Sequence, residues 1–344
     1  MLIQDYKNMS SINLYNIPYH DNDLSNYSFL ITGGAGFIGS NLVEYLLKYN
    51  ARHVRVLDNL STGNFNNIKD FLVLPNFEFI NGDIRDIEVC YKAVNGMDYV
   101  SHQAALGSVP RSIADPISTN KVNVEGFLNI LLACKESKAI KRLIFASSSS
   151  IYGDSQKSPK TIGQEGKVMS PYAVTKLINE QYARVFNGLF DLHTIGLRYF
   201  NVFGPKQMYD NPYAAVLPKF CMSFVNNTPI KIFGDGETSR DFTFIENVVQ
   251  ANIKSFFSKK IDGGSILNVG AGKSTTLNSV CEILETITKT KVKIEYHLER
   301  AGDVKHSLAD ISKTIEEIQY NNIVDFVDGI KLTFEYYKNS YLNE

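Results

Sequence analysis

The sequence predicts an α/β protein built on a doubly wound parallel sheet, followed by a smaller C-terminal α/β lobe. Between residues 27 and 200, short apolar runs alternate with helical patterns, which is typical of βαβ units. A glycine-rich turn follows the first apolar run, as in parallel sheets that bind a ligand at their edge. The chain has 344 residues, which is enough for two domains and a large core.

Six short segments in this region are predicted to be strands, and helical patterns separate most of them. The first, YSFLIT, is apolar almost throughout, as expected of a strand that is buried on both faces. The predicted strands are Tyr27–Thr32, His53–Asp58, Asn76–Asn81, Asp98–Gln103, Arg142–Ser147 and His193–Tyr199. The clearest predicted helices are Phe37–Tyr49, Val122–Ser137 and Pro171–Asn187.

The two ends of the chain differ from this regular part. Residues 1–26 are polar and rich in asparagine, and we expect an arm that precedes the first strand. After residue 200 the short strands 230–233, 265–269 and 292–296 are mixed with helices and long loops. We therefore predict a nucleotide-binding sheet domain over 27–200, to which some later segments return, and a substrate lobe over 201–344.

Composition and charge exclude several classes of protein. Lys plus Arg is 35 and Asp plus Glu is 36, and this net charge of −1 argues against a nucleic acid polymer as the partner. The four cysteines lie far apart and form no metal-binding pattern, so we expect no metal and a reducing cytoplasmic environment. No apolar run is long enough to cross a bilayer, and the first residues do not resemble a signal peptide, so we expect no membrane partner.

The glycine-rich turn predicts a dinucleotide site. Gly33, Gly36 and Gly39 form a GxxGxxG pattern between a predicted strand and a predicted helix. Glycines there permit a tight turn and let the backbone approach a pyrophosphate, while the helix N-terminus directs N–H groups at the phosphates. Asp58 ends the next strand and is placed to accept from ribose hydroxyls, which favours NAD over NADP. Asp83, after the third strand, is a candidate to hold the adenine, although a simple turn explains it equally well.

A tyrosine and a lysine in the segment SPYAVTK are candidates for acid–base chemistry. The spacing of Tyr172 and Lys176 puts both side chains on one helix face, where the ammonium would lower the pKa of the phenol. This pattern alone also occurs on solvated helices. The serine run 147–150 follows a predicted strand, so it lies at the edge of the sheet where ligands bind. A serine hydroxyl there could share a hydrogen bond with the alcohol that Tyr172 deprotonates.

Taken together, these motifs resemble the extended short-chain dehydrogenase/reductases with a Rossmann-type sheet, and among them the UDP-sugar 4-epimerases of the UDP-galactose 4-epimerase type. The resemblance covers residue 27 to the end and is closest to the bacterial UDP-N-acetylglucosamine 4-epimerases. The motifs that carry it are GGAGFIGS, LDN with STG, GDIRD, HQAALGSVPRS, SSSSIYGD, SPYAVTK, LRYFNVFGP and GDGETSRDF.

The resemblance implies a role for particular residues. Tyr172 would be the base, Lys176 would lower its pKa and hold the nicotinamide ribose, and Ser148 would be the hydroxyl partner. The NAD contacts would come from Gly33, Gly36, Phe37, Ile38, Gly39, Asp58, Asn59, Asp83, Ile84, Ala104, Ala105, Leu106, Asn123, Tyr172, Lys176 and Tyr199. The UDP-sugar would contact Ser108, Ser149, Ser150, Asn201, Val216, Leu217, Phe233, Arg240, Arg300, Asp303 and Ser307.

The implied reaction interconverts UDP-N-acetylglucosamine and UDP-N-acetylgalactosamine through a 4-keto sugar. Plain galactose enzymes commonly carry a lysine at the position of Gly107 and a tyrosine at that of Ser307, so the small residues here would admit an acetamido group. UDP-glucose, UDP-galactose and UDP-uronic acids remain alternative substrates. A 4,6-dehydratase would need an acid pair at the positions of Ser149 and Ser150. Serines lack the acid–base group that removes water, so this resemblance does not imply a dehydratase. The alternative of another class is a non-catalytic NAD-sensing protein, although such relatives often lose the tyrosine or lysine.

The same resemblance implies a homodimer in which each subunit contributes two helices. These would be the predicted helices 122–137 and 171–187. The apolar residues on them would serve an internal core equally well, so this expectation stays open at the level of the sequence.

Overall fold

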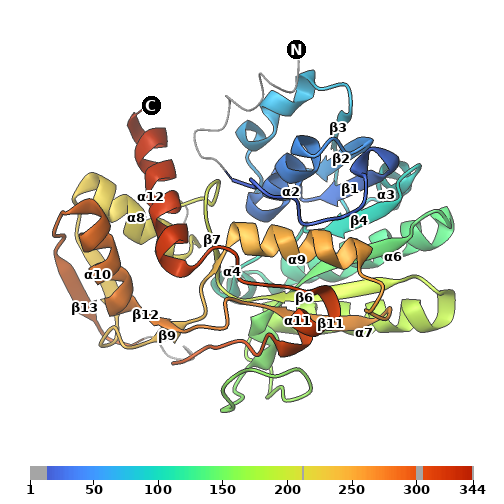
Figure 1. The fold of residues 1–344 in the computed structure, drawn as a ribbon. Coiled ribbons are helices and arrows are strands. Elements are labelled where there is room, and N and C mark those ends of the chain that lie inside the picture. Colours follow the sequence, from blue (N-terminus) through green and yellow to red (C-terminus); the bar gives the residue numbers. More distant parts are fainter. Residues whose placement is uncertain (1–13, 211–212, 300–304, 343–344) are drawn as a thin grey trace.

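A parallel sheet of seven strands forms the centre of the molecule (Figure 1). The computed structural model describes residues 14–210, 213–299 and 305–342. The strand order is β11-β6-β5-β4-β1-β2-β3, and every neighbouring pair is parallel. The strands are β1 (Ser28–Thr32), β2 (His53–Asp58), β3 (Phe77–Asn81), β4 (Tyr99–His102), β5 (Arg142–Ser148), β6 (Thr194–Tyr199) and β11 (Ser265–Val269). The predicted doubly wound parallel sheet is confirmed.

Helices cover both faces of the sheet because alternate strand residues point to opposite sides. On β1, Phe29 and Ile31 pack against one helical layer, whereas Leu30 packs against the other. The first layer contains α2 (Phe37–Lys48) and α9 (Ile245–Phe257), and the second contains α3 (Ile87–Val94), α6 (Gly126–Ser137) and α7 (Pro171–Phe190). Apolar burial on both faces explains why the strands read as nearly continuous apolar runs.

The strand order reverses between β1 and β4. From β1 the chain adds β2 and β3 on one side, and then returns to place β4, β5 and β6 on the other. Loops that leave β1 and β4 therefore diverge, and a crevice opens beyond the carboxyl ends of these strands. Ligands bind at this point in open α/β sheets, so the topology itself locates the site.

Short helical turns connect the larger elements. One predicted helix also starts later in the structure than the sequence pattern indicated. The helix expected over 122–137 is preceded by a π-helical turn, η4 (Lys121–Glu125), which continues directly into α6. The sequence pattern did not predict α4 (Val109–Ala114) or α5 (Pro116–Asn120), each of which has a serine or aspartate cap and a proline among its first two residues. The remaining turns are η1 (Leu24–Asn26), η2 (Phe65–Asn67), η3 (Lys69–Val73) and η5 (Ser149–Tyr152).

The described part of the N-terminal arm, residues 14–26, is packed against the body of the protein. Tyr15, Tyr19 and Leu24 are buried, and the Tyr15 hydroxyl donates to Asn41 Oδ1 on α2 over 2.7 Å. The Tyr15 backbone N–H donates to a carboxylate oxygen of Glu246 on α9 over 3.0 Å. This segment therefore joins the two helices of one layer, which a polar, asparagine-rich composition did not predict.

The C-terminal part forms a group of helices and short strand pairs beside the sheet, on the left in Figure 1. Besides α9, which covers one face of the sheet, β11 returns to the sheet itself: it pairs with β6, and its residues Ile266 and Leu267 are buried on opposite faces. The helices of this group are α8 (Val216–Asn226), α10 (Leu277–Thr288) and α12 (Phe326–Leu342), whereas α11 (Ser312–Ile318) packs against β11 and α9. The short strands are β7 (Val202–Phe203), β8 (Ile230–Phe233), β9 (Ser239–Arg240), β10 (Thr243–Phe244), β12 (Thr275–Thr276) and β13 (Ile294–His297).

Candidate functional site

The glycine turn between β1 and α2 is too tightly packed for side chains. Gly33 has a φ of +68°, and a Cβ atom on it would lie 2.7 Å from the backbone nitrogen of Ala104. A Cβ atom on Gly39 would lie 2.2 Å from the carbonyl oxygen of Gly33. The turn, the loop after β4 and the start of α2 are thus in backbone contact, as the sequence pattern predicts.

The start of α2 faces this turn with its backbone N–H groups available. Within the described part of the chain, no side chain caps the helix at Gly36. The leading N–H groups of a helix lack partners inside the helix and carry partial positive charge, so they suit a phosphate group. This arrangement fits the pyrophosphate of a dinucleotide.

Asp58 lies at the carboxyl end of β2 and holds the turn together. Its carboxylate accepts from the N–H of Ala35 over 2.9 Å and from the N–H of Leu60 over 2.8 Å. Burial raises the pKa of Asp58, and these two backbone hydrogen bonds oppose that shift. The side chain also lines the cavity described next, so it is placed to meet a ribose.

A cavity of about 400 Å³ lies beyond the carboxyl ends of β1, β2 and β4. It collects thirteen of the predicted site residues from separate parts of the sequence. These are Gly33, Gly36, Phe37, Ile38, Gly39, Asp58, Asn59, Asp83, Ile84, Ala104, Ala105, Leu106 and Ser108. Ser108 was predicted to contact the sugar and lies on the same cavity as the predicted NAD contacts. The glycine cradle, the uncapped helix and the carboxylate at β2 together fit NAD.

Asn59 and Asp83, which both line the cavity, contact each other. The Asn59 amide donates to Asp83 Oδ2 over 2.7 Å, and Arg85 also binds this carboxylate over 2.6 Å. The pKa of Asp83 is lowered to about 2, chiefly by the hydrogen bond from Arg85. Asp83 therefore stays ionised and accepts hydrogen bonds at neutral pH.

The cavity also contains residues that the sequence analysis missed. Lys206, Gln207, Met208 and Tyr213 line it from the segment after β7. The Lys206 ammonium lies 2.6 Å from a carboxylate oxygen of Glu44 on α2, so its charge already has a partner. No periodic pattern marks this segment, but its place directly after the motif LRYFNVFGP is a signal that could have pointed to it.

Asn123 connects the cavity to the helix that carries the predicted catalytic residues. Its side chain exchanges hydrogen bonds with the backbone of Leu106, accepting over 2.8 Å and donating over 3.2 Å. It also donates to Thr175 Oγ1 on α7 over 3.1 Å. Asn123 itself does not line the cavity. It holds the cavity loop at a fixed position relative to Tyr172 and Lys176.

The predicted catalytic residues Ser148, Tyr172 and Lys176 lie together where β5 ends and α7 begins. The Ser148 side chain lies close enough to the Tyr172 hydroxyl to lower the pKa of the phenol. The Lys176 ammonium donates to the carbonyl oxygen of Ala146 over 2.8 Å and lies 5.9 Å from the centre of the Tyr172 ring. The structure brings these three residues together, although none of them lines the cavity.

The pKa of Tyr172 does not shift in the predicted direction. Burial raises the pKa of the phenol, and the hydrogen bond with Ser148 offsets only part of this effect. Burial also lowers the pKa of Lys176 to about 8, so the ammonium form is less strongly favoured over the neutral amine than in an exposed lysine. His102 on β4 is buried, and its pKa is lowered to about 3 by burial and by the charge of Lys176, so it is neutral.

Tyr199 lies away from the cavity, unlike the other predicted NAD contacts on strand ends. It is buried, and its hydroxyl accepts from Asn252 on α9 over 2.9 Å. The hydroxyl also lies 3.3 Å from Oε1 of Gln103, which does line the cavity. Tyr199 is therefore connected to the cavity through its hydrogen bond with Gln103.

Two serines predicted to contact the sugar follow Ser148 directly in η5. Ser149 is partly exposed. The Ser150 hydroxyl is buried and has no hydrogen-bond partner among the described residues, although its backbone N–H donates to Ser148 Oγ over 3.1 Å. A buried hydroxyl of this kind is available to a ligand.

The residues predicted to bind the UDP half come from several separate segments. Arg240 on β9 and Ser307 lie close together, because the Ser307 N–H and an Arg240 N–H both donate to the Ser239 carbonyl, over 3.2 and 2.9 Å. Asn201 donates to the carbonyl of Asp241 over 3.2 Å. Val216 and Leu217 begin α8, and Phe233 ends β8, with its ring 5.6 Å from that of His297. The predicted contacts Arg300 and Asp303 lie outside the described residues.

The described residues contain no group of three or more His, Cys, Asp or Glu residues that could hold a metal ion. None of their helices is both long and apolar enough to span a membrane.

Comparisons with known proteins agree with this geometry. The NAD dependent epimerase/dehydratase family matches residues 29–270. A UDP-glucose 4-epimerase of Mycolicibacterium smegmatis is 32% identical over 90% of this chain and 98% of its own length. A UDP-glucuronate 4-epimerase of Thermodesulfobacterium geofontis is 33% identical over 91% of this chain and 96% of its own.

A solved structure is similar over nearly the same length. The UDP-N-acetylglucosamine 4-epimerase of Methanobrevibacter ruminantium, in complex with UDP-N-acetylmuramic acid, is 38% identical. The similarity covers 91% of this chain and 99% of that one, with a TM-score of 0.86. The chain belongs to the NAD dependent epimerase/dehydratase family. The predicted family, the enzyme class of NAD-dependent epimerases and the cofactor NAD are thereby confirmed.

Proposed function

We propose that this protein interconverts UDP-N-acetylglucosamine and UDP-N-acetylgalactosamine by inverting C4 of the sugar. The observation that carries the preference for N-acetylated sugars is the small side chain of Ser307. It lies beside Arg240, which is predicted to bind the diphosphate of the UDP-sugar. Gly107 adds to it, since this residue lines the cavity and a Cβ atom there would meet no atom within 4 Å. The similarity to a UDP-N-acetylglucosamine 4-epimerase supports the same substrate class.

In this proposal the reaction begins when Tyr172 takes the proton of the C4 hydroxyl. Bound NAD supplies the hydride acceptor and later the hydride donor, so no net redox change occurs. Ser148 lies beside the phenol and would donate or accept a hydrogen bond with the hydroxyl of the sugar, which orients that hydroxyl toward Tyr172. A protonated Lys176 would stabilise the tyrosinate as it forms and would so oppose the rise in the pKa of Tyr172 that burial causes.

Inversion requires a firm hold on the nucleotide and a permissive space around the sugar. Arg240 can bind phosphate oxygens bidentately, and we assign the same role to Arg300 from the sequence resemblance. The further UDP contacts in this proposal are Asn201, Val216, Leu217, Phe233 and Asp303. Ser149 and the hydroxyl of Ser150, which has no partner among the described residues, would meet the sugar and could do so in either orientation. Residues 27–200 would thus bind NAD, and residues 201–344 would bind the UDP-sugar.

The experiment that tests this function is an assay of C4 inversion by proton NMR with three substrates. Purified protein is incubated separately with UDP-N-acetylglucosamine, UDP-glucose and UDP-glucuronic acid. We expect the N-acetylated sugar to give the highest kcat/KM. A higher value for UDP-glucose or for UDP-glucuronic acid would favour a UDP-glucose or a UDP-glucuronate 4-epimerase, like the two relatives described above. Tight NAD binding without inversion of any sugar would favour a binding protein.

The proposed homodimer would form through α7, and exposed apolar side chains support this. Val174, Val185 and Leu189 are 40%, 49% and 70% exposed and lie on one face of that helix. On the other predicted helix, however, Phe127 and Leu131 are fully buried in the core of the subunit. They serve the fold rather than an interface. The cytoplasmic location stays a prediction.

A further inference from the structure

Three consecutive residues at the end of β5 each contact a different residue of α7. The Ala146 carbonyl accepts from Lys176, and the Ser148 side chain lies beside the Tyr172 phenol and lowers its pKa. Between them, the Ser147 hydroxyl donates to Oε1 of Glu180 over 2.5 Å. Glu180 therefore ties α7 to β5 one helical turn after Lys176, whereas Tyr172 lies one turn before Lys176 on the same face.

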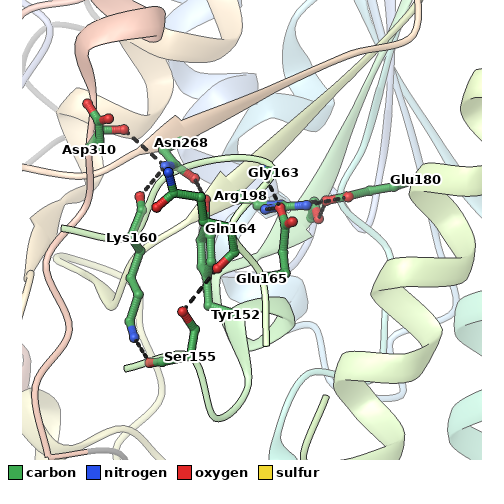
Figure 2. A network of polar contacts seen from close by, with 11 residues as sticks. Tyr152, Ser155, Lys160, Gly163, Gln164, Glu165, Glu180, Arg198, Asn268 and Asp310 are labelled. Atoms are coloured by element: carbon green, nitrogen blue, oxygen red, sulfur yellow. Dashed lines mark hydrogen bonds and ion pairs between the residues drawn. The ribbon is translucent and has the colours of Figure 1, made fainter. Parts of the chain in front are cut away.

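The Glu180 carboxylate is itself fixed by Arg198 on β6 (Figure 2). Two parallel hydrogen bonds of 2.8 Å join Arg198 Nε to Oε1 and Nη2 to Oε2. Both side chains are buried, with 3% and 4% of their surfaces exposed. A second carboxylate, that of Glu165, binds Nη1 of the same guanidinium from the loop before α7.

The same guanidinium leads to the C-terminal part of the chain. It lies 4.9 Å from the centre of the Tyr152 ring, and the Tyr152 hydroxyl donates to Asn268 Oδ1 over 2.7 Å. Figure 2 shows Asn268 between Lys160 and Asp310, and it donates to the carbonyl oxygens of both over 2.9 Å. Glu180 thus belongs to a polar network that crosses from β5 to the segment just after Ser307.

We propose that Glu180 is a positioning residue for the reaction, which holds Lys176 and Tyr172 in register with the end of β5. This inference rests on the proposed function, because it concerns the residues assigned to that reaction. A buried ion pair is a weak source of stability, since desolvation of both charges offsets their attraction. The ion pair does, however, fix the relative position and orientation of its two side chains, which a hydrophobic pair would not do. A displacement of about 1 Å in a catalytic group can lower the rate roughly 100-fold, so the fixed geometry has a large effect on the rate.

Glu180 also acts on the charge of Lys176, which is four residues before it on the same helix. The carboxylate favours the ammonium form and opposes the effect of burial. Since Lys176 is assigned to the nicotinamide ribose, loss of Glu180 should weaken cofactor binding as well as the proton transfer. This gives a measurement that does not depend on turnover.

The test compares Glu180→Gln with Glu165→Gln, which is a matched control. Each variant removes one negative charge from Arg198, but Glu165 makes no hydrogen bond to β5 or α7 among the described residues. In Glu180→Gln the amide NH2 group faces the guanidinium, so the parallel pair cannot form. We expect kcat to fall about 10-fold or more with KM for the UDP-sugar changed by less than about 3-fold.

The second readout is the affinity for NADH, measured by the fluorescence of the bound dihydronicotinamide. We expect Glu180→Gln to weaken it about 5-fold or more and Glu165→Gln to change it by less than about 2-fold. Equal effects of the two variants on kcat and on NADH affinity would overturn the proposal and leave the network a purely structural role. If the wild-type protein inverts no UDP-sugar, the proposed function fails, and the NADH comparison still decides the role of Glu180.

A milder variant covers the case in which Glu180→Gln does not fold. Ser147→Ala removes one hydrogen bond between β5 and Glu180 and leaves the ion pair with Arg198 in place. We expect NADH affinity and kcat to fall about 3-fold each, which corresponds to the loss of one hydrogen bond. Values equal to those of the wild-type protein would overturn the proposal.

Discussion

Replacing Gly39 with alanine tests whether backbone contact at the glycine turn sets the position of the cofactor. A Cβ atom at residue 39 would lie 2.2 Å from the carbonyl oxygen of Gly33 and 2.8 Å from Cα of Gly34. Both neighbours are backbone atoms, so no side-chain rotation relieves the overlap. Real Cβ contacts are essentially never shorter than 3.0 Å, and the difference between 3.0 and 2.2 Å means that the turn and α2 must separate by about 0.8 Å.

Two effects of this substitution oppose each other. Alanine is favoured over glycine inside a helix by about 1 kcal/mol. Overpacking costs about 1–3 kcal/mol, and α2 has little freedom to move because Leu42 and Tyr45 on it are fully buried. We therefore expect a net destabilisation of up to ~2 kcal/mol, together with a shift of the N–H groups at the start of α2 that weakens NAD binding about 10-fold or more.

The assay measures NAD per chain, from the nucleotide released on heating, and Tm by circular dichroism. Gly188→Ala is the matched control, because Gly188 lies exposed in α7 and its added Cβ would meet no atom within 4 Å. The control should keep its NAD and melt slightly higher, in line with a gain of about 0.5–1 kcal/mol. If Gly39→Ala keeps the wild-type NAD content and Tm, the turn does not constrain the cofactor as argued.

Substrate range, pH dependence and assembly each depend on particular side chains. Ser307→Tyr should reduce turnover of the N-acetylated UDP-sugar about 10-fold more than that of UDP-glucose, and equal losses would contradict a gate at this position. The pKa of Lys176 is lowered to about 8, so native Lys176 binds its proton less tightly than the unfolded chain does, and the native state gains stability as the pH rises from about 8 toward 10.5. The stability of NAD-stripped Lys176→Met relative to wild type should therefore fall by ~2 kcal/mol between pH 7 and pH 9.5, and a constant difference would argue against this pKa. The double variant Val185→Glu and Leu189→Glu should convert a dimer into a monomer by light scattering, and a monomeric wild-type protein would exclude the interface.

The central sheet and the cofactor cavity were predictable because they depend on patterns that are local in sequence. An apolar run marks each strand, and polar residues such as Asp58 and Asp83 stand where a strand ends. Parallel strands place their carboxyl ends at one edge of the sheet, so residues that follow different strands meet in space. Strand ends and the glycine turn therefore indicated where the cavity lies, and the family resemblance added further lining residues such as Ala104 and Ser108, so that thirteen lining residues were predicted in all.

Contacts between distant segments could not be derived in this way. The burial of Tyr15 and Tyr19 depends on their fit against α2 and α9, which the composition of the arm does not show. Glu180 stood four residues after Lys176 on the same helix face, a signal that could have singled it out, but its partner Arg198 is on another strand. The direction of the pKa shift of Tyr172 was predicted wrongly, because the pattern indicates the neighbouring lysine but not the extent of burial.

Arg240 is predicted to anchor the diphosphate, and Ser307 is predicted to admit the acetamido group. Both residues are held by the same backbone carbonyl. The N–H of Ser307 and an N–H of Arg240 both donate to the carbonyl oxygen of Ser239. A bulky side chain at residue 307 that moved its own backbone would therefore also move Arg240. Such a shift would weaken the binding of every UDP-sugar to the same extent, whereas a filled pocket would discriminate between them. The ratio of the kcat/KM values for two substrates, and not either value alone, therefore separates the two effects of Ser307→Tyr.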